Sequence, residues 1–281
     1  MPSLTHDCRP PLRRLAGYAV VASSLLWSGC GPSPSFEGVT TGFSGTSRST
    51  SVSVPIPPSG GGSGDGAELL IAILGIQGNP STSAPEGWTA VPGFAGFNGA
   101  TCQGDVRGVA CQLSVFYKLS DGSETTADFS WNGARGAAGA VVRYSNIDPD
   151  DPIGEAASLR GTSVQPRAPG VTTTQDGSRV LRIVTVELDE VKRFLTGSVA
   201  LTDEAPTARL NMVSFPDLES DPTNGCGPPL SECDATETAV ALGVSDTRHT
   251  TAEPSGPANW ELPSPDQWLS ASIEIRRAPG P

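Results

Sequence analysis

Hydrophobic and polar residues alternate in several segments of this chain. In residues 111–119, 126–131 and 269–276 nearly every second residue is apolar. This period of two is typical of antiparallel strands that have one face on a core and the other in water. The pattern predicts that Ser270 and Ser272 face solvent. Four further segments are almost continuously apolar and favour central strands covered on both faces: residues 69–76, 137–142, 180–188 and 238–244.

Turn-forming residues separate these segments. The chain of 281 residues contains 33 Gly and 26 Pro, which leaves little room for long helices. Pairs such as Asp121-Gly122 and Asn132-Gly133 are typical of tight turns. We therefore predict an all-β fold, a single antiparallel β-sandwich of the jelly-roll or lectin-like kind. Few or no helices are expected outside a signal peptide, and no internal repeat of the sequence is evident.

The N-terminus has the pattern of an export signal. Arg9, Arg13 and Arg14 precede an apolar run, and small residues follow it. The ending Leu26-Trp27-Ser28-Gly29-Cys30 resembles the lipobox of bacterial lipoproteins, although Trp27 stands where an aliphatic residue is usual. The resemblance implies cleavage after residue 29 and a lipid on Cys30. The alternative is an ordinary signal peptide that is cut nearby.

This interpretation divides the chain into a signal peptide (residues 1–29), a lipidated tether (30–40) and a β-sandwich domain (41–281) with an insert at 216–237. The order of features in the domain resembles that of secreted bacterial β-sandwich modules of undefined activity. The resemblance rests on Val52-Ser53-Val54-Pro55, Pro85-Glu86-Gly87-Trp88-Thr89 and Val115-Phe116-Tyr117-Lys118. It implies a fold rather than an activity.

The charge balance restricts the partners. Eighteen Lys and Arg face 30 Asp and Glu, a formal charge of −12, which argues against nucleic acid. We expect an exported lipoprotein of the bacterial cell envelope, held in the outer membrane or at the cell surface by its N-terminal lipid. Its role is binding or structural, with a polysaccharide or an envelope protein as the candidate partner. The alternative is a polysaccharide-active enzyme or carbohydrate-binding protein on a lectin-like sandwich.

Four cysteines remain after Cys30 in the predicted mature chain. In an exported protein they suggest two disulfides rather than a zinc site. Three connectivities are open, and proximity in sequence favours the pairs that we predict: Cys102–Cys111 and Cys226–Cys233.

No catalytic residue can be assigned. Glu187 and Asp189 resemble the first two carboxylates of the E-x-D-x-x-E motif of laminarinase-like glycosidases, but Lys192 occupies the position of the third. A lysine is too weak an acid to protonate the leaving oxygen at neutral pH, so we expect a charged turn. His249 lies in a polar loop and is not expected to act as a base.

An acidic segment is the candidate for a metal ion. Asp148, Asp150 and Asp151 supply clustered carboxylate oxygens, which Ca²⁺ prefers, and Asn146 and Glu155 lie close by in sequence. The EF-hand spacing is absent, so a solvated acidic turn is the default interpretation. No other cofactor is expected.

The tryptophans are the remaining candidates for ligand contact, because an exposed indole can stack on a sugar or anchor a protein. Trp131 ends an alternating strand on its apolar side and is expected in the core. Trp88 and Trp260 lie beside turns rich in Gly and Pro and are the candidate surface residues.

Overall fold

A computed structural model describes residues 31–44, 49–60, 67–78, 80–92, 94, 111–188, 200–201, 206–214, 239–262 and 265–280. These residues form strands, turns and extended segments. Within them we find no helix with the length and hydropathy to cross a membrane. The prediction of an all-β antiparallel fold is confirmed.

The strands agree closely with the segments that the hydropathy pattern indicated. In chain order they are β1 (Ser35–Phe43), β2 (Ser49–Pro55), β3 (Ala67–Gln77), β4 (Thr82–Ser83), β5 (Thr89–Ala90), β6 (Cys111–Leu119), β7 (Thr126–Arg135), β8 (Ala137–Ile147), β9 (Ile153–Ser163), β10 (Arg167–Ala168), β11 (Arg179–Leu188), β12 (Ala200–Leu201), β13 (Thr207–Ser214), β14 (Ala239–Arg248), β15 (Ala258–Glu261) and β16 (Asp266–Ile275).

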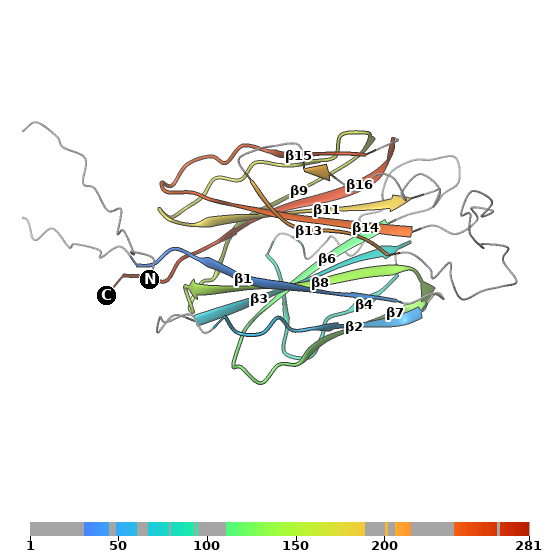
Figure 1. Cartoon of the computed structure of the whole chain (residues 1–281), viewed down its shortest axis with the longest axis horizontal. Helices are drawn as coiled ribbons and strands as arrows, with labels where there is room; N and C mark the ends of the chain where they lie inside the picture. The colour runs from blue at the N-terminus through green and yellow to red at the C-terminus, as the bar shows by residue number, and fades with distance from the viewer. Residues whose placement is uncertain are drawn as a thin grey trace, which may run out of the picture.

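The strands form four antiparallel sheets that are stacked as layers (Figure 1). Two inner sheets have the orders β1-β8-β3-β6-β5 and β13-β14-β11-β16-β9. The first inner sheet is covered on its outer side by the small sheet β2-β7-β4, and the second by the small sheet β10-β15-β12.

The two halves of the chain repeat one topology. Adding eight to each strand number of the first inner sheet gives the strand order of the second inner sheet, and the same operation relates the two outer sheets. Within each half the first strand pairs with the eighth, the second with the seventh and the third with the sixth. This pairing is that of a jelly roll. We call residues 31–147 the first half and residues 153–278 the second half.

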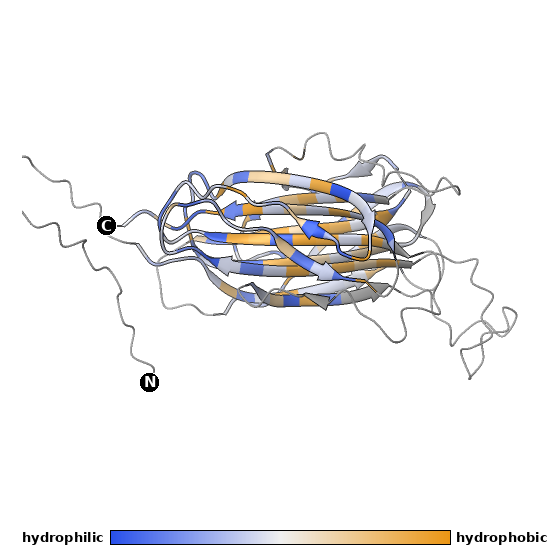
Figure 2. Ribbon diagram, turned by 90° about the horizontal axis from the view of Figure 1, so that it is seen from above, coloured by the Kyte–Doolittle hydropathy of each residue, from blue (hydrophilic) through white to orange (hydrophobic). Residues whose placement is uncertain are grey.

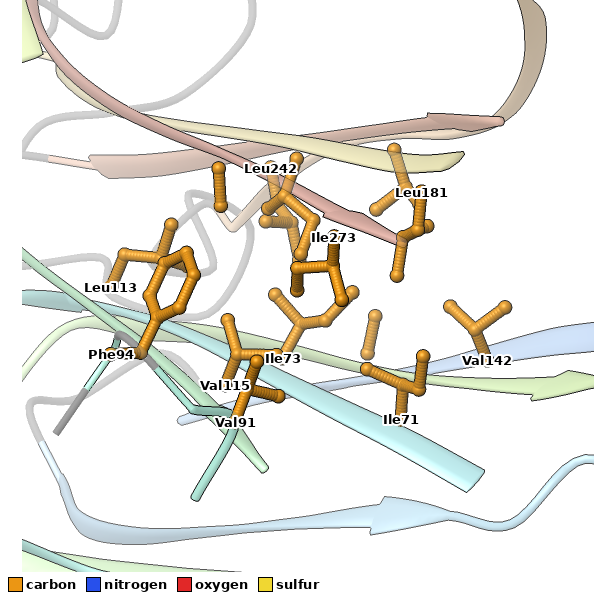
Figure 3. Close-up of a cluster of buried hydrophobic side chains, with 14 of the residues drawn as sticks. Ile71, Ile73, Val91, Phe94, Leu113, Val115, Val142, Leu181, Leu242 and Ile273 are labelled. Carbon is orange, nitrogen blue, oxygen red and sulfur yellow. The ribbon is translucent and has the colours of Figure 1, made fainter. Parts of the chain in front are cut away.

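Three apolar layers lie between the four sheets. The central one joins the halves, with Ile73 and Leu113 of the first inner sheet facing Leu242 and Ile273 of the second (Figure 3). Full burial of one such side chain contributes roughly 1.5–3 kcal/mol. The two outer apolar layers lie within the halves, under the small sheets. Seen from above, hydrophobic and hydrophilic positions still alternate along single strands (Figure 2).

The polar positions of β16 are buried, which corrects the expectation that they face water. The side chains of Ser270 and Ser272 point under the second outer sheet and are fully buried. Residues 167–169, at β10 and just after it, cover these two serines, and we call them the covering segment. The Ser270 hydroxyl donates to the Arg167 carbonyl (2.8 Å) and the Ser272 hydroxyl to the Pro169 carbonyl (2.6 Å). The covering segment is too short and irregular to pair all its carbonyls within a sheet, so serine supplies the missing donors.

The predicted tether also requires correction, because the first strand begins within it. Ser35–Phe43 forms β1, an edge strand that pairs with β8 in the first inner sheet. Phe36 and Val39 pack against the central apolar layer, and this contact holds a segment that is otherwise rich in small and polar residues. Residues 1–30, which contain the predicted signal peptide and Cys30, lie outside the described residues.

Candidate functional site

A buried carboxylate joins the two halves at the end of the sandwich where β1 begins. Asp246 lies on the inner face of β14 and its side chain is fully buried. The carboxylate accepts a hydrogen bond from Arg179 Nη1 (2.7 Å) and two from Arg209, Nε to Oδ2 and Nη2 to Oδ1 (both 3.0 Å). Tyr144 on β8 donates its hydroxyl to Oδ2 at 3.0 Å, from the opposite half. We call these four residues the Asp246 network.

A bulge in β13 brings Arg209 into this network. The register of β13 against β14 shifts between Ala208 and Leu210, so the extra residue leaves the regular alternation. A bulge of this kind re-aims one side chain without ending the strand. The Arg209 guanidinium lies over the Phe36 ring, 4.2 Å from its centroid. Phe36 in turn meets Tyr144 edge to face, with ring centroids 5.9 Å apart.

The charges in the Asp246 network keep its hydrogen bonds between the two halves in place. Burial, and then the negative charge of Asp246, raise the pKa of the Tyr144 phenol well above its ordinary value. The phenol therefore remains protonated and serves as a donor. Two guanidinium groups surround one carboxylate, and a charge that is buried in this way needs such partners. Arg179 also donates from Nε to the Pro34 carbonyl (3.1 Å).

Each half also has a buried charged residue at an equivalent position of its eighth strand. Arg143 on β8 lies opposite Leu70, as Glu274 on β16 lies opposite Val180. Both point toward the outer sheet of their own half and are almost completely buried. The repeated topology thus places opposite charges at the same site.

These two charges fix the chain segments that cross from the inner to the outer sheets. The Glu274 carboxylate accepts from the backbone amides of Thr174 (2.7 Å) and Glu155 (3.2 Å) and from the Ser178 hydroxyl (2.9 Å). Arg143 donates from Nε to the Pro57 carbonyl (2.8 Å) and pairs with Glu68. Both charges therefore have a structural role.

The acidic turn is organised by contacts within the protein. Asp148 Oδ1 accepts from the amides of Asp150 (3.0 Å) and Asp151 (3.3 Å), and Asp151 forms an ion pair with Arg276. Glu155 Oε2 accepts from the Thr172 amide at 2.7 Å. Among the described residues, no three His, Cys, Asp or Glu side chains gather as a metal site.

The tryptophans are placed differently from one another. Trp131 is in the first outer apolar layer, as predicted, and Trp88 is half-buried against the same layer. Trp260 is 2% exposed and packs in the second outer layer beside Trp268, so the predicted surface position of Trp260 is wrong. The turns next to Trp260 led to that prediction, but β15 directs the indole inward against Gly243.

His249 follows β14 and is shielded from solvent. Its backbone amide donates to the Ser178 carbonyl (2.9 Å), and Nδ1 lies 3.9 Å from Glu253 Oε1. Burial, and then the nearby charge of Arg182, lower the pKa of the imidazole, which is therefore neutral at pH 7. The His249 side chain is 11% exposed and therefore does not lie on an open surface.

Several predicted residues fall outside the described part of the chain. These are Cys30, Cys102, Cys226, Cys233, Asp189, Lys192 and the insert at 216–237. Cys111 and Glu187 are described only as backbone positions of β6 and β11.

Sequence reasoning missed Asp246, Glu274 and Arg143. Their signal was a charged residue at an alternate position of a strand that is otherwise apolar or small. A strand with one solvent-exposed face has the same pattern, so the burial of these three residues was not evident from the sequence. Comparison of the chain with protein-family models, with curated proteins and with solved structures finds no match.

Proposed function

We propose that this chain is an exported bacterial envelope lipoprotein, anchored by a lipid on Cys30, whose β-sandwich acts as a binding or structural module. The observation that supports a structural role is that the buried charged residues all bind other parts of the protein. Asp246 joins the two halves, while Glu274 and Arg143 fix the covering segments of each half. Groups of this kind give rigidity to a scaffold.

The lipid anchor rests on the sequence that precedes the fold. An apolar run ends in Ser28-Gly29-Cys30, and the next residue, Gly31, is buried and accepts a hydrogen bond from Arg277. A lipid on Cys30 would therefore attach directly beside the sandwich.

The test is the partition of the protein expressed with its full N-terminus in a bacterial host. We expect the wild type in the detergent phase of an envelope extract and Cys30→Ser in the aqueous phase. Cys8→Ser is the matched control, because Cys8 lies in the predicted signal peptide and its loss should leave partition unchanged. Detergent partition of Cys30→Ser would overturn the lipid assignment.

The role of the sandwich is tested separately, on the purified mature protein with a panel of polysaccharides. Binding without hydrolysis supports a binding module. Hydrolysis that Glu187→Gln abolishes would overturn the proposal in favour of a glycosidase.

A further inference from the structure

The four residues that follow Cys30 lie against the second half of the sandwich. Gly31 is buried, and its carbonyl accepts a hydrogen bond from Arg277 Nη1 at 3.1 Å. The Pro34 carbonyl accepts from Arg179 Nε at the same distance. The segment is therefore held at both ends before β1 begins.

The packing around this segment is close. A Cβ at Gly31 would overlap the backbone oxygen of Ala278 and lie 3.1 Å from the Pro279 carbonyl carbon. Between the two hydrogen bonds, the Ser33 hydroxyl borders Gly177, where a Cβ would lie 3.0 Å from it. Only a residue without a side chain fits at position 31.

We propose that residues 31–34 hold the sandwich directly against the lipid surface, without a flexible spacer, so that its strands stand away from the membrane in a fixed orientation. This inference rests on the proposed lipid anchor. A free segment of four residues would span up to about 14 Å and let the domain tumble. A docked segment fixes the point of attachment beside the end of β16.

The two ends of strand β9 provide label positions from which this orientation can be measured. The strand begins at the end of the sandwich where residues 31–34 are bound. Ile153 pairs there with Ile275, and the Arg276 amide donates to the Pro152 carbonyl. Its 11 residues extend about 35 Å to the opposite end of the sandwich. Asp150 and Gln165 are exposed residues that flank the two ends of this strand.

The experiment uses residues 30–281 with a phospholipid coupled chemically to Cys30, reconstituted in phosphatidylcholine vesicles. A fluorophore is placed at position 150 or 165 through an azide-bearing amino acid, and energy transfer to acceptor lipids is measured. We expect higher transfer from position 150 than from position 165. Equal transfer from the two positions, or higher transfer from 165, would overturn the inference.

Two variants test whether the docked segment causes the orientation. Gly31→Ala and Arg277→Ala should each remove the difference between the two labels. Arg276→Ala is the matched control, since Arg276 pairs with Asp151 and not with residues 31–34. A difference that survives both Gly31→Ala and Arg277→Ala would refute the role of this segment.

The chemical coupling separates this inference from the proposed function. A failure of lipidation in cells, seen as aqueous partition of the wild type, leaves the measured orientation intact. Tumbling on the vesicle, with normal lipidation in cells, refutes the inference alone.

Discussion

Replacement of Asp246 by asparagine should destabilise the protein by about 3 kcal/mol. The variant keeps the shape of the side chain but leaves Arg179 and Arg209 in the interior without a carboxylate. Removing one partner of a buried ion pair costs about 3–5 kcal/mol. The two arginine side chains are 14% and 21% exposed, so water relieves part of the repulsion and the lower end of that range applies.

The assay is equilibrium unfolding in urea at pH 7, monitored by tryptophan fluorescence. With a denaturant slope of about 2–3 kcal/mol per molar, the midpoint should fall by about 1 M or more. Tyr144→Phe removes one hydrogen bond of the same network and should cost about 1–2 kcal/mol.

The control is Asp151→Asn, which removes one partner of an ion pair whose aspartate side chain is 65% exposed. Such pairs contribute about 0–1 kcal/mol. A loss for Asp246→Asn no larger than that of Asp151→Asn would show that the buried ion pairs of the network do not stabilise the protein. A double-mutant cycle with Tyr144→Phe should give a coupling energy of at least about 0.5 kcal/mol.

Three further predictions concern packing, pH and the cysteines. Gly75→Ala should cost about 1–3 kcal/mol in thermal or urea unfolding, because its Cβ would overlap Thr185 across the central layer, whereas Gly256→Ala has open space and should be neutral. Burial raises the pKa of the Glu124 carboxyl, but hydrogen bonds from Lys118 and the backbone outweigh burial and lower this pKa to about 2. The stability of the protein should therefore fall as the pH drops from about 4.5 to 2. Glu124→Gln should remove that part of the pH dependence. Mass spectrometry of an unreduced digest should recover linked peptides for the two predicted disulfides, and free thiols or crossed links would contradict them: Cys102–Cys111 and Cys226–Cys233.

Strand positions followed from the sequence because the period of two is a local property. β6 has the bounds that the alternation indicated, and β3 and β11 extend the predicted apolar runs by only a few residues. What lies over each face is not local. Ser272 and Glu274 have the sequence pattern of a solvent-exposed face, yet backbone carbonyls and amides of distant segments cover them.

The repeated topology was likewise invisible in the sequence. Arg143 and Glu274 occupy equivalent positions with opposite charges, so two similar frameworks hold different side chains. A jelly roll requires alternation and turns, and many sequences satisfy both. Trp260 shows the same limit, since nearby turns did not reveal that β15 points its indole inward.

The order of the repeated halves along the chain has a consequence for the order in which they fold. Chains are made from the N-terminus, and domains generally fold as units as they emerge. The first half can complete all its ladders once Ile147 has appeared, since β8 pairs with both β1 and β3. Its inner face then presents Ile71, Ile73 and Leu113 to water until β11, β14 and β16 are made. A chain that folds from its N-terminus would therefore pass through a stage in which the first inner sheet is complete but its apolar face is exposed, and a holdase chaperone would bind at that stage.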